Sequence, residues 1–325
     1  MTRDIQEQLT KYLADAHAIE EQALAQLRTA PDLAGDPAIA ASFREHLTET
    51  EGHERLTREL LEARGAKPSR LKDAVMWTGG KGFLLFARLQ PDTPGKLLTH
   101  AISYEGLELA SYSLLGEVAN RAGEPDVEQA ATRIAGEERA MIERLEEHFD
   151  AAVDASLRAV GPDELREQLR KYLADAHALE QQAIALLERA PDIGGEAGLA
   201  SLYEEHLAET REHSELVESR LTALGGDPSS LKDSALRLGA LNWAAFFQGH
   251  PDTPGKLAAF AFAFEHLEAA AYEQLRRVAE RAGDQETASV AATILGEERA
   301  AAVRVAASFP LAAAASLDAL DVQPR

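Results

Sequence analysis

The chain has 325 residues and is strongly acidic, with 55 aspartate and glutamate residues against 33 lysine and arginine residues and a formal net charge of −22. This charge makes a nucleic-acid backbone or an anionic membrane an unfavourable partner. The chain contains no cysteine, which excludes disulfides, thiolate metal ligands and thiol catalysis. The first fifteen residues are charged and amphipathic, so we expect no secretory signal and no membrane span, and the default compartment is cytoplasmic.

The chain repeats itself at a shift of 160 residues. The string Lys11-Tyr-Leu-Ala-Asp-Ala-His-Ala18 recurs unchanged at residues 171–178, and one register holds along the whole length. We therefore predict a tandem duplication, with one domain over residues 1–160 and a second over residues 161–325. Alanine, leucine, glutamate and arginine dominate, and alternating polar and apolar stretches are almost absent. This composition predicts an all-α fold.

Each copy is expected to form four long helices. In the first copy, leucines recur on one stripe of the first helix, and the Gly35-Asp36-Pro37 cluster separates it from the second. The second helix should end at Gly65, because glycine is a favoured residue just after a helix. The third should begin after Pro94. The expected ranges are about 5–28, 37–64, 95–121 and 126–152, and the last can extend into a short tail helix.

The connection between the second and third helices is unusually long. It covers residues 66–94, which is too long for a hairpin between antiparallel neighbours. A crossover along the length of the bundle would account for it and would make the two middle helices parallel. Aromatic residues occur in this segment and in its counterpart in the second copy. We expect them to pack over one end of each bundle, with a partner or lipid contact as the alternative.

The second helix carries the strongest chemical pattern. His46, Glu49 and His53 are spaced by three and four residues, which places them on one helical face. The second copy keeps the same residue types at the equivalent positions, whereas residues on the outer face have changed. The retained counterparts are His206, Glu209 and His213.

The other helices each place a glutamate on or beside the apolar stripe. Glu20 lies on the first helix, Glu105 and Glu108 lie one turn apart on the third, and Glu138 lies on the fourth. Helical phase barely separates Glu138 from its neighbour Glu137, so either could face inward. All of these glutamates recur in the second copy, as Glu180, Glu265, Glu268, Glu298 and Glu297.

Imidazole and carboxylate groups together form the ligand set of iron, manganese or zinc. Several carboxylates in one bundle core would be very costly without bound cations to neutralise them. Glutamates from separate helices, one with a histidine nearby, are typical of a dinuclear centre in a four-helix bundle. His17 and His46, with their counterparts, could instead orient the ligands by hydrogen bonds or serve packing alone. The predicted ligands are Glu20, Glu49, His53, Glu105, Glu108 and Glu138, and in the second copy Glu180, Glu209, His213, Glu265, Glu268 and Glu298.

These motifs resemble the ferritin-like superfamily, and in detail its YciF-like stress-protein branch. The resemblance rests on His46-Leu-Thr-Glu-Thr50 with His53, on Glu265-His-Leu-Glu268 with Tyr272, and on the Glu137-Glu138 pair. It implies two tandem ferritin-like four-helix bundles, each with a long crossover between its second and third helices. It also implies a dinuclear, di-iron site in each bundle and a role linked to stress. Unlike many relatives, the fourth helix has no histidine one turn after its glutamate, so the expected sites are rich in carboxylates.

The leading hypothesis is a soluble metal-binding protein with two iron ions, or manganese ions, in each bundle. It would oxidise ferrous iron or react with oxygen or peroxide in stress protection, as a ferroxidase-type oxidoreductase. The alternative is a non-catalytic structural or interaction module with vestigial metal sites. Hydrolytic zinc chemistry is disfavoured, because so many carboxylates suit a harder, redox-active metal pair. The duplication also predicts that the two repeats pack as a pseudo-dimer.

Overall fold

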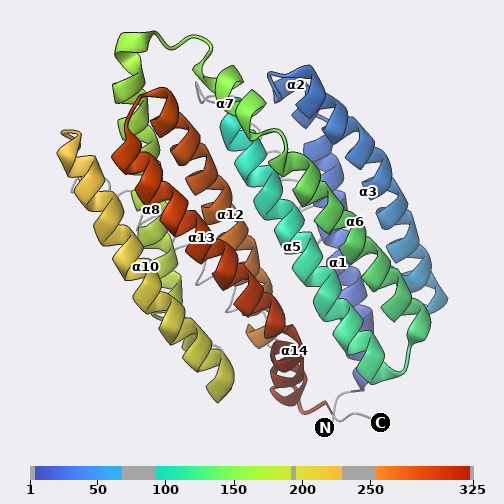
Figure 1. Cartoon of the computed structure of the whole chain (residues 1–325). Coiled ribbons are helices and arrows are strands. Elements are labelled where there is room, and N and C mark those ends of the chain that lie inside the picture. Colours follow the sequence, from blue (N-terminus) through green and yellow to red (C-terminus); the bar gives the residue numbers. More distant parts are fainter. Residues whose placement is uncertain (1–3, 68–92, 192–194, 229–252, 323–325) are drawn as a thin grey trace. The chain divides into compact units, whose positions relative to one another are not determined.

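The computed structural model of the chain describes residues 4–67, 93–191, 195–228 and 253–322, and these residues form helices and turns with no β-strand. They divide into two compact units, Met1–Arg158 together with Leu320–Arg325, and Ala159–Ala319. The predicted all-α tandem bundle is therefore confirmed (Figure 1).

The first unit is a bundle of four long helices. α1 lies against α3 and α5, and α6 also lies against α3 and α5, so the four helices enclose one core. Two short helices, α2 and α7, complete the unit (Figure 1). In chain order the helices are α1 (Ile5–Leu27), α2 (Ala30–Leu33), α3 (Pro37–Ala63), α5 (Thr93–Ala122), α6 (Pro125–Glu146) and α7 (Phe149–Leu157).

The second unit repeats this arrangement. α8 and α13 are each in contact with both α10 and α12, which reproduces the order of the helices around the first bundle. A single 3₁₀ turn, η1, precedes the first helix of the unit, and a short helix follows the last long one. The elements are η1 (Pro162–Glu164), α8 (Leu165–Leu187), α10 (Ala197–Ala223), α12 (Thr253–Arg281), α13 (Gln285–Ala307) and α14 (Phe309–Asp318).

The predicted crossovers, with the aromatic segments that they carry, lie outside the described residues. The helices that the first crossover would join do run in the same direction (Figure 1). Early in both helices His46 of α3 is 3.0 Å from Glu105 of α5. Later in both, Arg64 just after α3 is 2.7 Å from Glu124 just after α5. Contacts that advance together along both helices require that α3 and α5 run parallel, as the long connection predicts.

The helix ends largely follow the sequence signals. Asp36 caps α3 by accepting hydrogen bonds from the backbone N–H groups of Ala38 and Ile39, at 2.8 and 3.3 Å. Gly65 follows α3 with a φ of +70°, the left-handed conformation that glycine adopts at low cost. The fourth helix is shorter than predicted, since α6 ends at Glu146 and α7 begins at Phe149. This turn allows Phe149, which is buried, to pack with α7 against α5 instead of extending past the bundle.

The core lies between the inward faces of the four helices. Leu9, Leu13, Ile134 and Leu145 are fully buried there, and each buried side chain of this size contributes about 1.5–3 kcal/mol. Near mid-length the apolar stripe is interrupted by fully buried glutamates, of which Glu138 is one. Within the described ranges no single helix is long and apolar enough to cross a membrane. Among the described helices, α13 and α14 pass that test when taken together, and the pair is bent by 46° at its break.

Candidate metal centres

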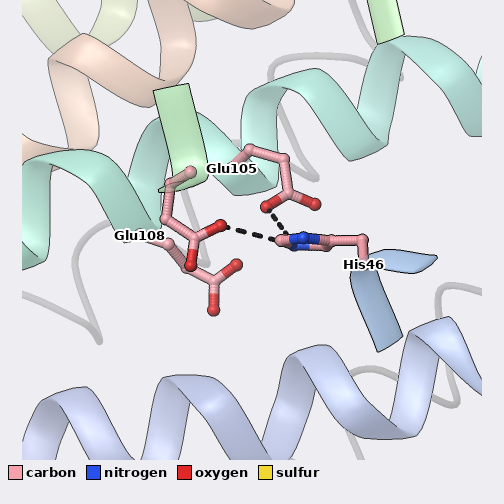
Figure 2. A group of neighbouring side chains, drawn as sticks. His46, Glu105 and Glu108 are labelled. Carbon is pink, nitrogen blue, oxygen red and sulfur yellow. Dashed lines mark hydrogen bonds and ion pairs between the residues drawn. The ribbon is translucent and has the colours of Figure 1, made fainter. Parts of the chain in front are cut away.

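The first group of possible metal ligands lies at mid-length of the first bundle. His46 comes from α3, Glu105 and Glu108 from α5, and Glu138 from α6. One nitrogen or oxygen from each lies within 4.8 Å of the others, and all four residues are buried. Figure 2 shows the imidazole of His46 turned toward the carboxyl groups of Glu105 and Glu108. The predicted ligands Glu105, Glu108 and Glu138 therefore lie close together. His46, for which the sequence suggests a supporting or structural role, lies among them.

A second group shares one residue with the first. It consists of Glu20 from α1, His53 from α3 and, again, Glu138, with one donor atom of each within 4.8 Å of the others. Oε1 of Glu138 lies 2.9 Å from Nδ1 of His53, and its Oε2 lies 3.3 Å from Nε2 of His46. The centroids of the two imidazole rings are 6.5 Å apart. Glu138 thus presents one oxygen to each histidine.

The second bundle contains the same two groups. Oε1 of Glu298 lies 2.8 Å from Nδ1 of His213, and its Oε2 lies 4.0 Å from Nε2 of His206. The glutamate on α13 is therefore shared in the same way as Glu138. The full groups are His206, Glu265, Glu268 and Glu298, and Glu180, His213 and Glu298.

Each histidine is held on its outer side by another carboxylate. Nδ1 of His46 lies 2.9 Å from Oε2 of Glu49, and Nε2 of His53 lies 2.5 Å from Oε2 of Glu137. Each ring therefore keeps one nitrogen for the cluster while the other is held by a glutamate. This arrangement fixes ring orientation and tautomer in metal sites. The second bundle repeats it, with His206 against Glu209 at 3.3 Å and His213 against Glu297 at 2.8 Å.

Glu49 was predicted as a ligand but lies outside both groups. Its carboxylate also accepts a hydrogen bond from Arg144 of α6, at 2.9 Å. The hydrogen bond to His46, supported by Arg144, lowers the pKa of Glu49 to about 2, although partial burial acts in the opposite direction. Arg304 contacts Glu209 in the second bundle in the same way. The arginine recurs at the same position in both copies, and this recurrence is the signal in the sequence that could have indicated the contact.

Helical phase does not decide whether Glu137 or Glu138 faces the core, whereas the structure does. Glu138 is fully buried and belongs to both groups, whereas the side chain of Glu137 is 39% exposed. Glu20 is held by Tyr112 of α5, whose hydroxyl donates a hydrogen bond to Oε1 of the glutamate. The same contact joins Tyr272 and Glu180 in the second bundle.

Burial perturbs the acids strongly. It raises the pKa of Glu20 to about 8, with a further increase from the nearby charge of Glu138. It also raises the pKa of Glu108 well above its ordinary value, again with the charge of Glu138 adding to the effect. Glu20 therefore holds its proton at pH 7 when no cation is bound.

The shared glutamate behaves in the opposite way. Burial alone would raise the pKa of Glu138, but hydrogen bonds with His46 and His53 lower it to about 2. Burial alone would lower the pKa of His53, yet Glu138 and Glu20 raise it to about 9. At pH 7 without metal, an ionised Glu138 therefore lies against a protonated His53.

The donor set fits divalent metal ions. Both oxygens of Glu108 are buried, and neither finds a hydrogen-bond donor in the described part of the chain; the same holds for Glu268. A buried carboxyl group without donors is costly, whereas a bound cation would use both oxygens. Four glutamates and two histidines per bundle match the ligands of iron, manganese or zinc. The residues in each unit therefore form buried groups that could bind metal.

A small cavity lies beside the cluster of the first bundle. It has a volume of about 20 Å³, enough for a molecule the size of water. Glu105 lines it together with Tyr104, His100 and Gln26. Burial lowers the pKa of His100 to about 4, so this ring is neutral near pH 7. The three polar neighbours of Glu105 become Phe264, Phe260 and Leu186 at the equivalent positions of the second copy.

Fold and clusters together define an all-α protein of two tandem helical bundles, each with buried histidine–glutamate groups that could hold metal. A family model described as a domain of unknown function, DUF892, matches residues 4–158 and again residues 164–316. The chain therefore belongs to the DUF892 family and contains two copies of its domain. No solved structure gives a significant match.

Proposed function

We propose that each bundle holds a dinuclear metal centre of the ferritin-like type, with iron as the metal and manganese as the alternative. The single observation that carries this proposal is the sharing of Glu138 between two ligand groups, repeated by Glu298. Buried acids cost free energy when they lie close together without cations, so a function is needed to explain why both copies of the duplicated chain keep them around one shared carboxylate.

In the first bundle His46, Glu105 and Glu108 would bind one ion, Glu20 and His53 would bind the other, and the carboxylate between them would bridge. Glu49 and Glu137 would orient the two imidazole rings. In the second bundle the corresponding ligands would be His206, Glu265, Glu268, Glu180, His213 and Glu298, oriented by Glu209 and Glu297.

Bound iron would supply one-electron redox chemistry, by which the protein would oxidise ferrous iron or reduce oxygen or peroxide in stress protection. The chain's own residues would position the ions and exclude bulk water from them, since Glu20, Glu108 and Glu138 are at most 1% exposed. Tyr112 would hold Glu20 in place by donating its hydroxyl hydrogen bond to Oε1. The cavity beside Glu105 would admit only a small molecule.

Loading with iron tests the proposal. The metal-free chain is titrated with Fe²⁺ without oxygen, bound iron is counted, and ferric absorbance is followed after oxygen is added. We expect about two ions per bundle and oxidation faster than in buffer. The double variant E138Q/E298Q should lose most of this binding, because it removes the shared carboxylate from both bundles. Its control is E7Q/E167Q, which neutralises one exposed glutamate on the first helix of each bundle.

Other outcomes would point elsewhere. Iron binding that is equal in E138Q/E298Q and in the control would reject the dinuclear centre. A folded chain that binds no iron would favour the alternative, a structural or interaction module with vestigial sites. Tight binding without oxidation would leave a metal-binding protein and reject the ferroxidase-type activity. Packing of the two repeats as a pseudo-dimer stays a prediction that rests on the duplication alone.

A further inference from the structure

A third histidine–glutamate group lies outside the two ligand groups of the first bundle. His17 and Glu21 are one turn apart on α1, and Glu54 faces them from α3. One donor atom from each lies within 4.8 Å of the others, and Nε2 of His17 is 3.1 Å from Oε1 of Glu54. Glu21 and Glu54 directly follow the predicted ligands Glu20 and His53 in the sequence. They therefore lie on a different face of the same two helices.

We propose that His17, Glu21 and Glu54 bind a single divalent transition-metal ion. One imidazole and two carboxylates are a sufficient donor set for manganese, iron, cobalt or zinc, with the remaining coordination positions left to water. His17 and Glu54 are buried, while Glu21 is partly exposed. The ion would thus enter from the solvent side past Glu21. This site does not depend on the dinuclear centres.

An arginine competes for the same carboxylate. Nη1 of Arg58 lies 3.1 Å from Oε1 of Glu54, and its side chain is 43% exposed. An ion pair of an exposed arginine adds little stability, so a divalent cation can displace it and the guanidinium can move into solvent. Metal binding would then replace the single positive charge of Arg58 by the double positive charge of the ion, next to the carboxylates of Glu21 and Glu54.

The second bundle shows what the same helices do without this site. His177 is kept, but Gln181 and Ser214 replace the two glutamates, and Nε2 of Gln181 donates a hydrogen bond to Oγ of Ser214 at 2.8 Å. Both carboxylates are thus exchanged together for a neutral pair that still joins the two helices. The acids are therefore not needed to pack the first helix on the second. His177 does keep one carboxylate nearby, because Glu218 stands at the position of Arg58 and lies 3.7 Å from its Nε2. The set of one histidine and two carboxylates is nevertheless lost, and a metal-binding role in the first repeat accounts for its presence there.

The test exchanges these residues between the two repeats of the full chain. E21Q/E54S gives the first repeat the residues of the second, and Q181E/S214E does the reverse. The metal-free proteins are dialysed against Mn²⁺, and bound ions are counted by electron paramagnetic resonance. We expect one ion fewer per chain in E21Q/E54S and one more in Q181E/S214E. The metal-free unfolding midpoint of E21Q/E54S should stay close to that of the wild type, because the second repeat folds with these residues.

Two results would overturn the site. Mn²⁺ binding by E21Q/E54S that equals wild-type binding means that the group binds no metal. Loss of more than one ion means that the two glutamates belong to the neighbouring centre. This inference is separated from the proposed function by adding E138Q to the wild type and to E21Q/E54S. The difference of one ion between the E138Q chain and the E21Q/E54S/E138Q chain should persist even if the dinuclear centre of that bundle is lost.

Discussion

Glu108 and its counterpart Glu268 provide a test of why the buried acids are present. In each bundle this glutamate has both carboxyl oxygens buried, and neither has a hydrogen-bond donor among the described residues. If the group serves metal binding, it lowers the stability of the metal-free fold. Replacing both residues by leucine, which has a similar volume, should therefore stabilise the metal-free protein and abolish the dinuclear centres.

The expected size follows from the missing donors. A buried polar group without a partner costs about 1–3 kcal/mol, so its removal should return about that much in each repeat. For a domain of this size 1 kcal/mol moves the unfolding midpoint by about 2–4 °C, which predicts a rise of about 2–12 °C for E108L/E268L. Metal should reverse the order. A ligand at about 1,000 times its Kd adds about 4.1 kcal/mol to the wild type, which exceeds the cost of about 1–3 kcal/mol, and the variant would not gain this.

Differential scanning calorimetry of chelator-treated and Mn²⁺-loaded proteins measures both effects. The control is E108Q/E268Q, which loses the same two carboxylates but keeps a buried polar group, so its metal-free midpoint should not rise. A metal-free E108L/E268L protein that is less stable than the wild type would refute the reasoning. It would show that these carboxyl groups make stabilising contacts in the absence of metal.

Three further predictions concern the remaining charges. The metal-free protein should be less stable at pH 9 than at pH 6, because the folded pKa values of Glu20 (about 8, from 4.5) and His53 (about 9, from 6.5) are both raised. The folded state then binds more protons than the unfolded state, so the free energy of unfolding falls as pH rises through these pKa values. Urea titrations at both pH values measure this free energy, and an increase from pH 6 to pH 9 would contradict the prediction. Glu49→Gln should weaken Mn²⁺ binding about 10–100-fold by releasing the ring of His46, whereas equal affinity would remove its orienting role. Asp284→Ala should cost about 1–2 kcal/mol in urea unfolding, because the side chain caps α13 by accepting from the N–H of Thr287 at 2.9 Å; an unchanged midpoint would show that the cap is not needed.

The duplication, the helical fold and most of the buried acids follow from the sequence alone. Residues three or four apart share a helical face whatever surrounds them, so the inward position of Glu20, His53 and Glu108 could be predicted from spacing. The internal comparison strengthened this prediction, because these glutamates and histidines are the same in both copies while many residues around them differ. Helix ends at Asp36 and Gly65 were also predictable, since capping depends on local backbone geometry.

Only the tertiary structure decided what each inward group meets. Adjacent residues on a helix differ by about 100° in direction, so the burial of Glu138 and the outer position of Glu137 depend on how α6 is rotated against its neighbours. Glu49 has the spacing of a ligand, but its carboxylate lies against Arg144 of α6 and the outer nitrogen of His46. His46 points inward because two different helices supply the carboxylates on either side of its ring. Spacing along one helix determines a face, whereas coordination requires atoms from several helices to meet, and that depends on packing.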